Sequence, residues 1–180
     1  MRVIAGIYRG KKLKEFSLSS TKPTLDRVKE SLFSSIQFNL IGAKVLDLFA
    51  GTGALGIESL SRRASSVDFV DANPEAIKII KQNLQGIDGK FSVIKSDYMS
   101  YLNQARLNGI TYDIILLDPP FDTDFGIKAI EYIIDNALLN DEGVIMYEKL
   151  YTTPFKLNKD GYTYTQKKYG TVGVVKIVKG

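Results

Sequence analysis

The 180-residue sequence predicts an α/β fold built on a mostly parallel β-sheet with helices on both faces. Short β-like apolar runs alternate with helical segments through the middle of the chain, which is the pattern of repeated β-α-β units. A glycine-rich loop directly follows the first of these runs, at Gly51. After Pro154 the pattern changes to two β-rich runs, which predict an antiparallel hairpin at the edge of the sheet.

The first 40 residues lie outside the alternating pattern and predict a basic extension. Arg2–Ile4 and Lys11–Lys14 can pair as a small β-hairpin around Tyr8-Arg9-Gly10. An amphipathic helix is expected from Leu25 to Phe38, because one of its faces is apolar. That face holds Val28, Leu32, Phe33 and Ile36. We expect a single domain, with residues 1–40 as the extension and residues 41–180 as the core.

In the core, strands and helices are expected in alternation, and the strands are short apolar runs of the kind found in buried parallel sheets. The expected strands are Lys44–Phe49, Val67–Asp71, Phe91–Lys95, Tyr112–Leu117 and Val144–Glu148. The expected helices are Ala54–Arg62, a helix that starts at Pro74 with Asn73 as its cap, Tyr98–Leu107 and Phe125–Asn136. The hairpin comprises Tyr162–Tyr169 and Thr171–Val178, joined at Gly170.

The sequence contains no cysteine and no histidine. It therefore has neither a disulfide framework nor a zinc site of the usual Cys/His kind, and we expect no metal. A Ser-His-Asp triad and a cysteine nucleophile are excluded as well. Any chemistry must rely on carboxylates, backbone groups, aromatic rings, lysine or arginine, or on a cofactor that arrives already reactive. No apolar stretch approaches the ~18 residues that cross a bilayer, and no signal peptide is visible, so we expect a cytoplasmic protein.

The net charge of +4 is distributed unevenly along the chain. Residues 1–30 hold eight lysines and arginines against three acids, and residues 156–180 hold six lysines against one acid. The residues between them carry ten basic and sixteen acidic side chains. Basic ends around an acidic centre indicate that the ends contact a polyanion while the middle holds a separate site.

The loop Gly51-Thr52-Gly53-Ala54-Leu55-Gly56 matches the pattern G-x-G-x-x-G. With Asp71 following Gly51 by 20 residues, it also satisfies the fingerprint of NAD-binding enzymes. Asp47 argues against a dinucleotide, because a carboxylate just before the first glycine would repel a pyrophosphate. The same charge suits a ligand with an amino group and a positive sulfonium. The loop therefore predicts S-adenosylmethionine as the cofactor.

Six residues are predicted to bind this cofactor, at strand ends where ligands bind in open α/β sheets. Gly51 and Gly53 let the backbone pass close to its methionine part. Asp71, at the end of the second strand, can accept hydrogen bonds from both ribose hydroxyls. Asp97, after the third strand, is placed to accept a bond from the adenine amino group. The full set is Asp47, Phe49, Gly51, Gly53, Asp71 and Asp97.

The most specific local signal is Asp118-Pro119-Pro120-Phe121, directly after the fourth strand. The two prolines stiffen the loop, so that the Asp118 carboxylate and the Pro119 carbonyl can act as paired acceptors. Two acceptors match the two N–H bonds of an exocyclic amino group, and Phe121 can stack on the base that carries it. Such an amine attacks as a neutral species, so that catalysis is mainly positioning and electrostatics, with no need for a strong base.

Taken together, these motifs resemble the bacterial 16S ribosomal RNA guanine methyltransferases, which modify the 2-amino group of one guanine in the small subunit. The resemblance covers essentially the whole chain. At the N-terminus it rests on Arg2-Val3-Ile4-Ala5-Gly6, Tyr8-Arg9-Gly10-Lys11-Lys12-Leu13, Pro23-Thr24-Leu25-Asp26-Arg27-Val28-Lys29-Glu30 and Leu32-Phe33. In the core and at the end it rests on the cofactor loop Leu46–Glu58, the tetrapeptide Asp118–Phe121 and the turn Lys168-Tyr169-Gly170.

The resemblance implies a Rossmann-like class I methyltransferase fold with a seven-stranded sheet and a reaction that gives 2-methylguanosine and S-adenosylhomocysteine. It also implies 16S rRNA as the partner, within a small-subunit assembly particle, and we expect a monomer. In this interpretation basic residues near the N-terminus grip phosphates, which position the RNA without specifying the base. They are Arg2, Arg9, Lys11, Lys12, Lys22 and Arg27.

Three positions depart from the family pattern. Lys22 stands where arginine is commoner, which keeps the charge but loses a bidentate phosphate contact. Asp71 replaces the more usual glutamate and is one methylene shorter. Phe121 replaces the more frequent tyrosine, so stacking survives without the hydroxyl.

Other functions fit parts of the pattern. A DNA adenine methyltransferase holds an exocyclic amine in the same way, but such enzymes usually carry a target-recognition domain for which this chain has no room. A nicotinamide oxidoreductase would use the glycine loop but has no role for Asp118–Phe121, and a non-catalytic RNA-binding module would not require that tetrapeptide either. Arg27 and Lys29 could form salt bridges along their helix, with Asp26 or Glu30, instead of contacting RNA.

Overall fold

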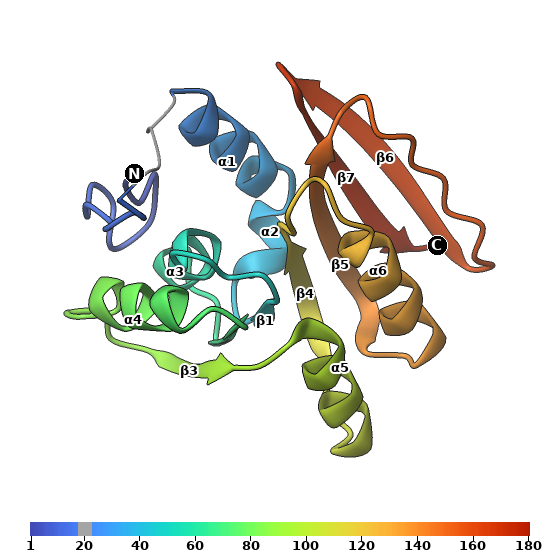
Figure 1. The fold of residues 1–180 in the computed structure, drawn as a ribbon, viewed down its shortest axis with the longest axis horizontal. Coiled ribbons are helices and arrows are strands. Elements are labelled where there is room, and N and C mark those ends of the chain that lie inside the picture. Colours follow the sequence, from blue (N-terminus) through green and yellow to red (C-terminus); the bar gives the residue numbers. More distant parts are fainter. Residues whose placement is uncertain (18–22) are drawn as a thin grey trace.

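The computed structural model describes residues 1–17 and 23–180 and has the predicted α/β architecture (Figure 1). Its seven-stranded sheet has the order β3-β2-β1-β4-β5-β7-β6. The strands are β1 (Lys44–Asp47), β2 (Ser66–Asp71), β3 (Lys90–Lys95), β4 (Tyr112–Leu117), β5 (Leu139–Leu150), β6 (Tyr162–Tyr169) and β7 (Val172–Lys179). The helices are α1 (Pro23–Ser35), α2 (Gln37–Leu40), α3 (Ala54–Ser61), α4 (Pro74–Asn83), α5 (Tyr98–Leu107) and α6 (Phe125–Asp135).

Strands β1 to β5 are parallel, whereas β7 runs antiparallel to both of its neighbours, β5 and β6. The chain builds the sheet outward from β1, first through β2 and β3 and then on the other side through β4 and β5. The direction of winding therefore reverses between β1 and β4. In open parallel sheets, a ligand-binding crevice forms at such a switch point, at the carboxyl ends of the strands.

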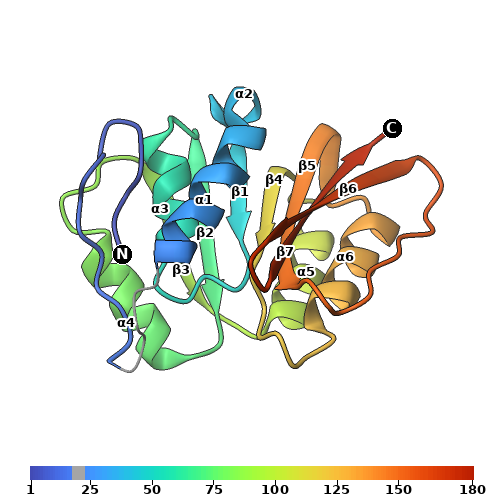
Figure 2. The same ribbon diagram turned by 90° about the horizontal axis from the view of Figure 1, so that it is seen from above.

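Two apolar cores hold the helices to the sheet, one on each face (Figure 2). Helices α1 to α4 supply the first core, in which Phe33 and Ile57 are fully buried. Helices α5 and α6 supply the second core, and successive residues of β1 alternate between the two, with Val45 in the first and Leu46 in the second. Because the strands are buried on both faces, their sequence runs are continuously apolar rather than alternating.

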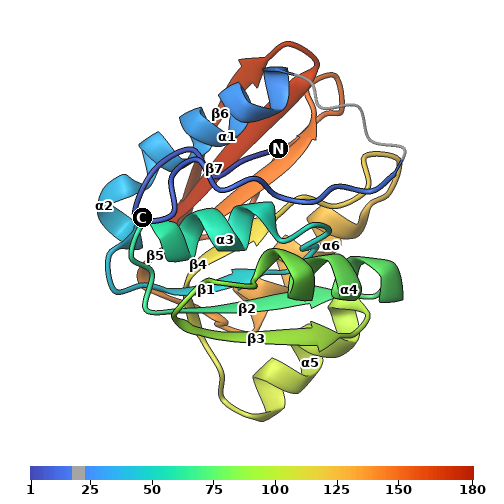
Figure 3. The same cartoon turned by 90° about the vertical axis from the view of Figure 1, so that its left-hand side faces the viewer.

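Residues 1–16, called the N-terminal strap from here on, pass beside α1, α3 and α4 (Figure 3). The predicted N-terminal hairpin is reduced to a single antiparallel bridge between Arg2 and Lys12. The ladder extends no further because the next amides, those of Ile4 and Ala5, donate to the side chain of Glu58 instead of to a partner strand.

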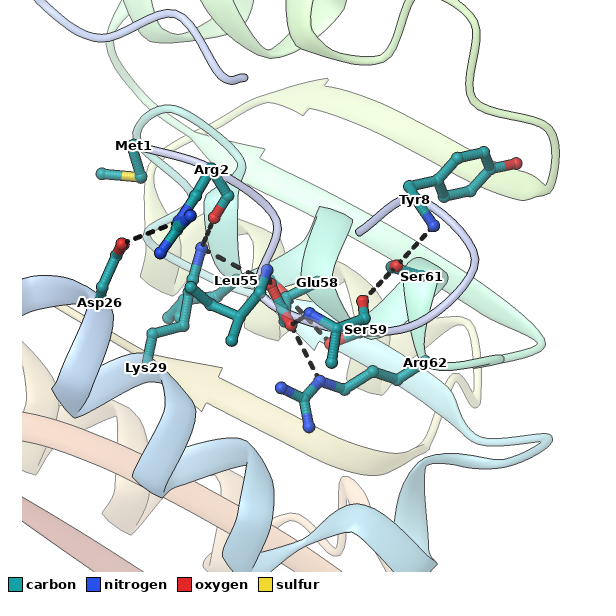
Figure 4. A network of polar contacts seen from close by, with 12 residues as sticks. Met1, Arg2, Tyr8, Asp26, Lys29, Leu55, Glu58, Ser59, Ser61 and Arg62 are labelled. Carbon is teal, nitrogen blue, oxygen red and sulfur yellow. Dashed lines mark hydrogen bonds and ion pairs between the residues drawn. The ribbon is translucent and has the colours of Figure 1, made fainter. Parts of the chain in front are cut away.

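The buried carboxylate of Glu58 on α3 fixes the strap to two helices (Figure 4). Its oxygens accept hydrogen bonds from the amides of Ile4 and Ala5 at 2.9 and 3.0 Å. Arg62 Nε lies 2.9 Å from the same carboxylate, and Lys29 Nζ of α1 lies 3.5 Å from it. Lys29 thus pairs with α3 rather than with a neighbour on its own helix. Strap, α1 and α3 share one buried ionic network.

Two elements differ from the sequence expectation by more than two residues. The helix expected from Leu25 to Phe38 is divided into α1 and α2, because Ile36 leaves the helical conformation with φ −124° and ψ 12°. Strand β5 begins at Leu139 rather than Val144, since Leu139 pairs with Tyr112 across an irregularity in the β4–β5 ladder. In the part of the chain that the structure describes, no helix has the length and apolar character needed to cross a membrane.

Candidate active site

A cavity of about 550 Å³ opens beyond the carboxyl ends of β1, β2 and β4, at the switch point of the sheet. Its volume lies in the usual range for small-molecule sites. The lining combines carboxylates and an amide with several aromatic rings, which suits a ligand with polar and apolar parts. The lining residues are Phe16, Leu48, Phe49, Gly51, Asp71, Ala72, Asn73, Ala76, Ser96, Asp97, Tyr98, Asp118, Pro119, Pro120, Phe121 and Phe125.

The glycine loop turns at the edge of this cavity through two left-handed residues. Gly51 has a φ of 56°, lines the cavity and donates its amide to Asp71 Oδ2 at 2.8 Å. Gly53 has a φ of 80° and is the N-cap residue of α3, but it does not line the cavity. A side chain at Gly53 would press on Ile80 and Phe69 behind the loop. Of these two predicted cofactor residues, Gly51 therefore lies at the cavity, whereas Gly53 lies in the turn behind it.

Asp47 lies beneath the glycine loop and not in the wall of the cavity. It is fully buried, and its Oδ2 accepts the amide of Gly56 at 2.9 Å. Its Oδ1 has no hydrogen-bond partner within the described residues, and burial raises the pKa of Asp47 to about 7. Asp47, which the sequence predicts to contact the cofactor, thus lies outside the cavity wall, where its carboxylate holds the first turn of α3 in place.

Asp71 and Asp97 both line the cavity, and each also shapes its own loop. The Oδ1 atom of Asp71 accepts the amide of Asn73 at 2.8 Å, and its Oδ2 accepts that of Gly51. The Oδ2 atom of Asp97 caps α5 by accepting the amides of two residues in its first turn, at 3.0 and 3.1 Å. A carboxylate has about four acceptor positions, so both side chains can still accept hydrogen bonds from a ligand.

Aromatic side chains form another part of the cavity wall. The ring of Phe49, a predicted site residue, lies 5.2 Å from that of Tyr98, which lies 4.9 Å from that of Phe125. Sequence reasoning missed Tyr98 and Phe125, although each is the first residue of a helix that follows the end of a strand. It also missed Phe16, which brings the strap to the cavity and carries no local signal.

All four residues of the tetrapeptide Asp118–Phe121 line the same cavity. The carbonyl of Pro120 accepts from the amide and the hydroxyl of Thr123, at 3.2 and 2.7 Å. In the described part of the chain, by contrast, no donor reaches the Asp118 carboxylate or the Pro119 carbonyl. Both acceptors that the sequence predicts for an amino group are therefore without a hydrogen-bond donor among the described residues.

The Asp118 side chain is exposed in the cavity, and partial desolvation by the surrounding protein raises its pKa to about 6. A second acid lies close by. Glu148 on β5 is buried, and its pKa is raised well above the usual value by burial and by the charges of Asp118 and Asp47. Sequence reasoning missed Glu148, whose only signal is an acid at the end of the apolar run of β5.

The arginines of the strap lie among acidic side chains of α1. Arg2 is exposed, and its Nε lies 3.4 Å from Asp26. Arg9 is also exposed and borders a small cavity of about 240 Å³ that Arg2, Asp26 and Glu30 also line. The predicted RNA contacts Arg2 and Arg9 are therefore accessible, but two carboxylates offset their charge.

The other basic residues predicted to bind RNA are placed differently. Lys11 Nζ donates to the carbonyl of Gln85 at 2.8 Å, so this side chain rests against the end of α4. Lys12 and Arg27 are exposed. Lys22 lies outside the described residues.

A second basic surface lies between α1 and the C-terminal hairpin, as a groove of about 330 Å³. Lys176 Nζ donates to the carbonyl of Ser35 at 2.8 Å, and the hydroxyls of Ser31 and Tyr169 are hydrogen-bonded across the groove. Within the described residues its lining includes lysines and hydroxyls but no acid. The lining residues are Ser31, Leu32, Ser35, Met146, Thr165, Lys167, Tyr169, Val174 and Lys176.

Comparison with solved structures defines the class of protein. The structure of a candidate methyltransferase from Escherichia coli matches 99% of this chain and 97% of that chain, with a TM-score of 0.86 and 28% identity. A candidate methyltransferase in complex with S-adenosylhomocysteine shares the fold, with a TM-score of 0.72 over 87% of this chain and 50% of that chain, at 20% identity. The fold is thus that of a class I, S-adenosylmethionine-dependent methyltransferase.

The particular family follows from the sequence itself. The chain belongs to the family described as Conserved hypothetical protein 95, whose model matches residues 1–178. The protein named Ribosomal RNA small subunit methyltransferase D from Haemophilus influenzae is 33% identical over 178 residues, which cover 97% of this chain and 90% of that protein.

Proposed function

We propose that this protein transfers the methyl group of S-adenosylmethionine to the exocyclic 2-amino group of a guanine in 16S ribosomal RNA. The observation that carries the proposal is the pair of unfilled acceptors, the Asp118 carboxylate and the Pro119 carbonyl, on a stiff loop in the cavity wall. The name of the Haemophilus influenzae relative supports small-subunit rRNA as the substrate.

The cavity residues fit the cofactor by the chemistry of their atoms. Gly51 presents backbone without a side chain, which allows close approach of the methionine part. Asp71 and Asp97 offer acceptors for the ribose hydroxyls and the adenine amino group, while Phe49 and Tyr98 offer apolar surface. When bound, the cofactor supplies an electrophilic methyl group.

The loop residues would then act on the target base. Asp118 and Pro119 each accept one N–H bond of the amino group, which orients its nitrogen lone pair toward the methyl carbon. As the nitrogen gained the methyl group and S-adenosylhomocysteine was released by cleavage of the carbon–sulfur bond, positive charge would develop on the nitrogen, and the ionised Asp118 would stabilise that charge. With a pKa of about 6, Asp118 is largely ionised at pH 7 and is also a better proton acceptor than an ordinary aspartate. Phe121, which is 39% exposed, is available to stack on the base.

We propose that the RNA reaches this cavity over two basic surfaces. One is the strap with the start of α1, where Arg9, Lys12 and Arg27 are exposed. The other is the groove between α1 and the hairpin, which includes Lys167 and Lys176. Since acids offset the strap arginines but not the groove lysines, the groove should contribute more to phosphate binding.

The test supplies methyl-labelled S-adenosylmethionine together with one nucleic acid at a time. The substrates are small ribosomal subunits from a strain that lacks the modification, naked 16S rRNA, and duplex DNA. The proposal predicts label in rRNA and none in DNA, with the small subunit as a better substrate than naked rRNA. Label in DNA adenine would favour a DNA adenine methyltransferase instead. Binding of a nicotinamide cofactor without S-adenosylmethionine binding would favour an oxidoreductase, and cofactor binding without transfer would favour a non-catalytic module.

A further inference from the structure

Glu148, at the carboxyl end of β5, has no part in the function proposed above. Its side chain is 8% exposed, and within the described residues it has no hydrogen bond or ion pair. An unpaired charge in such a place is costly, and a buried acid without a partner tends to remain protonated. Because Glu148 lies beside Asp118, its protonation state affects the charge of Asp118.

The register of the sheet brings Glu148 beside Asp118. Strands β4 and β5 pair in parallel up to Leu117 and Tyr147, so the next residue along each strand is Asp118 or Glu148. The charge of Asp118 acts directly on Glu148 and raises its pKa. The two acids are thus neighbours across the carboxyl edge of the sheet.

Asp47 on β1 belongs to the same group. It pairs with Leu116 of β4, one strand further along the sheet. Val45 and Met146, two residues before Asp47 and Glu148, both pack in the first core. Because side chains alternate along a strand, Asp47 and Glu148 face that same side. Together with Asp118 they form a row across three adjacent strands, called the acid row from here on.

The lysines of the neighbouring elements do not pair with these acids. Lys149, next to Glu148 on β5, donates to the carbonyls of Leu150 and Thr153. On β7, Lys176 donates to the carbonyl of Ser35, and on α1, Lys29 donates to the carbonyl of Arg2 and pairs with Glu58. Among the described residues no group of carboxylates is placed to hold a metal ion. The acid row must therefore reduce its own charge by keeping at least one proton.

We propose that Glu148 is a positioning residue that carries this proton and thereby leaves Asp118 as the ionised acid that faces the cavity. The order of the pKa values agrees, since Asp118 has a pKa of about 6, Asp47 about 7, and the pKa of Glu148 is raised well above its usual value. Two acids whose environments separate their pKa values can take different roles at one pH. The proposal rests on the role of Asp118 in the proposed function, because an ionised carboxylate stabilises the positive charge that develops on the amino nitrogen and a neutral carboxyl group does not.

The first experiment measures unfolding temperature from pH 5 to pH 9 for the wild type, Glu148→Gln and the control Glu131→Gln, an exposed position on α6. The folded protein holds the Glu148 proton, whereas the unfolded chain releases it above about pH 4.5. The wild type therefore loses stability relative to Glu148→Gln as pH rises. We expect similar unfolding temperatures at pH 5 and a growing advantage for Glu148→Gln above it, with the control parallel to the wild type throughout.

The second experiment measures kcat against pH for the wild type, Glu148→Gln and Glu148→Ala. Glutamine keeps the shape and the neutral charge of a protonated Glu148, so Glu148→Gln should keep the kcat of the wild type at pH 7. Its acid limb should also stay near the pKa of Asp118, about 6, because Asp118 has a neutral neighbour in both proteins. Glu148→Ala leaves an unfilled space beside Asp118, so its kcat should fall through lost packing.

Two results would overturn the proposal. One is a Glu148→Gln unfolding temperature that parallels the wild type at every pH, because Glu148 would then hold no extra proton. The other is a Glu148→Gln activity as low as that of Glu148→Ala, because an ionised carboxylate would then be required. The unfolding experiment needs no RNA substrate. If it gives the expected result while no methyl transfer is found, the proton assignment stands and the proposed function fails.

Discussion

At the scale of single residues, the cavity separates side chains that shape the loops from atoms that remain available to a ligand. Gly53 and Asp47 do only the first, since neither lines the cavity. Asp71 does both, because its oxygens hold two backbone amides at the cavity edge. Asp118 and Pro119 do only the second, and they carry the proposed chemistry.

Replacing Asp118 tests that division. Asp118→Ala should lower kcat by ~10²–10³, the effect of losing one preorganised polar group at the reacting atoms. Cofactor affinity, measured by calorimetry, should change little. Asp122→Ala is the matched control, because Asp122 is an exposed acid in the same loop that does not line the cavity. Equal kcat in Asp118→Ala and the wild type would remove Asp118 from the mechanism.

The third glycine of the loop has a packing role that can be tested separately. A Cβ on Gly56 would lie 2.2 Å from Cε1 of Phe69, where helix α3 crosses strand β2. Gly56→Ala should therefore lower the free energy of unfolding by about 1–3 kcal/mol, as other overpacked cores do. Urea denaturation measures this change. The double variant Gly56→Ala/Phe69→Leu should recover part of the loss, and a fully stable single variant would show that the contact is not tight.

At the scale of elements, the strap is held by α3 and α4. Asn83 of α4 accepts the amide of Lys14 at 2.7 Å and donates to the carbonyls of Lys14 and Thr52, at 3.0 and 2.9 Å. One side chain thus joins the strap to the glycine loop. Together with the network at Glu58, this explains how the strap reaches the cavity through Phe16.

Breaking the network at Glu58 should destabilise the whole protein. Glu58→Gln leaves the buried amine of Lys29 without its counter-charge, which typically costs about 3–5 kcal/mol. Chemical denaturation measures the loss. Lys29→Met/Glu58→Gln should be more stable than Glu58→Gln, because the uncompensated charge is then removed. If the double variant were no more stable than the single one, charge burial would not be the cause.

The two basic surfaces can be separated by the salt dependence of RNA binding. Lys167→Ala/Lys176→Ala and Arg9→Ala/Lys12→Ala should each weaken binding and flatten the plot of log affinity against log salt. The slope should change by about one unit for each phosphate that the variant no longer neutralises. The groove variant should show the larger change. The control pair is Lys78→Ala/Lys81→Ala on the exposed face of α4.

An unchanged slope in the groove variant would assign RNA binding to the strap. If the α4 control changed the slope more than the groove and strap variants do, the RNA would bind over the exposed face of α4. Cofactor affinity should be equal in all three variants, since none of these residues lines the cavity.

At the scale of the whole molecule, local sequence signals predict the sheet and most of the cavity. Continuous apolar runs mark β1, β2 and β4, and ligand residues follow directly after them, so Asp71 and Asp118 could be placed without a structure. Features that depend on contacts between residues far apart in the sequence could not be predicted. The pairing of Glu148 with Asp118 requires the β4–β5 register, and the hold of Glu58 on the strap joins residues more than 50 positions apart.

The orientation of the Asp47 side chain could not be predicted from the sequence either. Its spacing from the glycines correctly predicts a position at the loop, but spacing does not say whether a side chain faces the cavity or the core. The alternation of β1 between two cores decides that, and it turns Asp47 toward the amide of Gly56.

The central claim is that the Asp118 loop holds a guanine amino group for methylation, and nucleoside analysis tests it most directly. Small-subunit RNA is methylated with labelled S-adenosylmethionine by the wild type and by Asp118→Ala, then digested to nucleosides. We predict that the label appears as 2-methylguanosine with the wild type and is nearly absent with Asp118→Ala. Label in another nucleoside, or equal 2-methylguanosine from both proteins, would contradict the account.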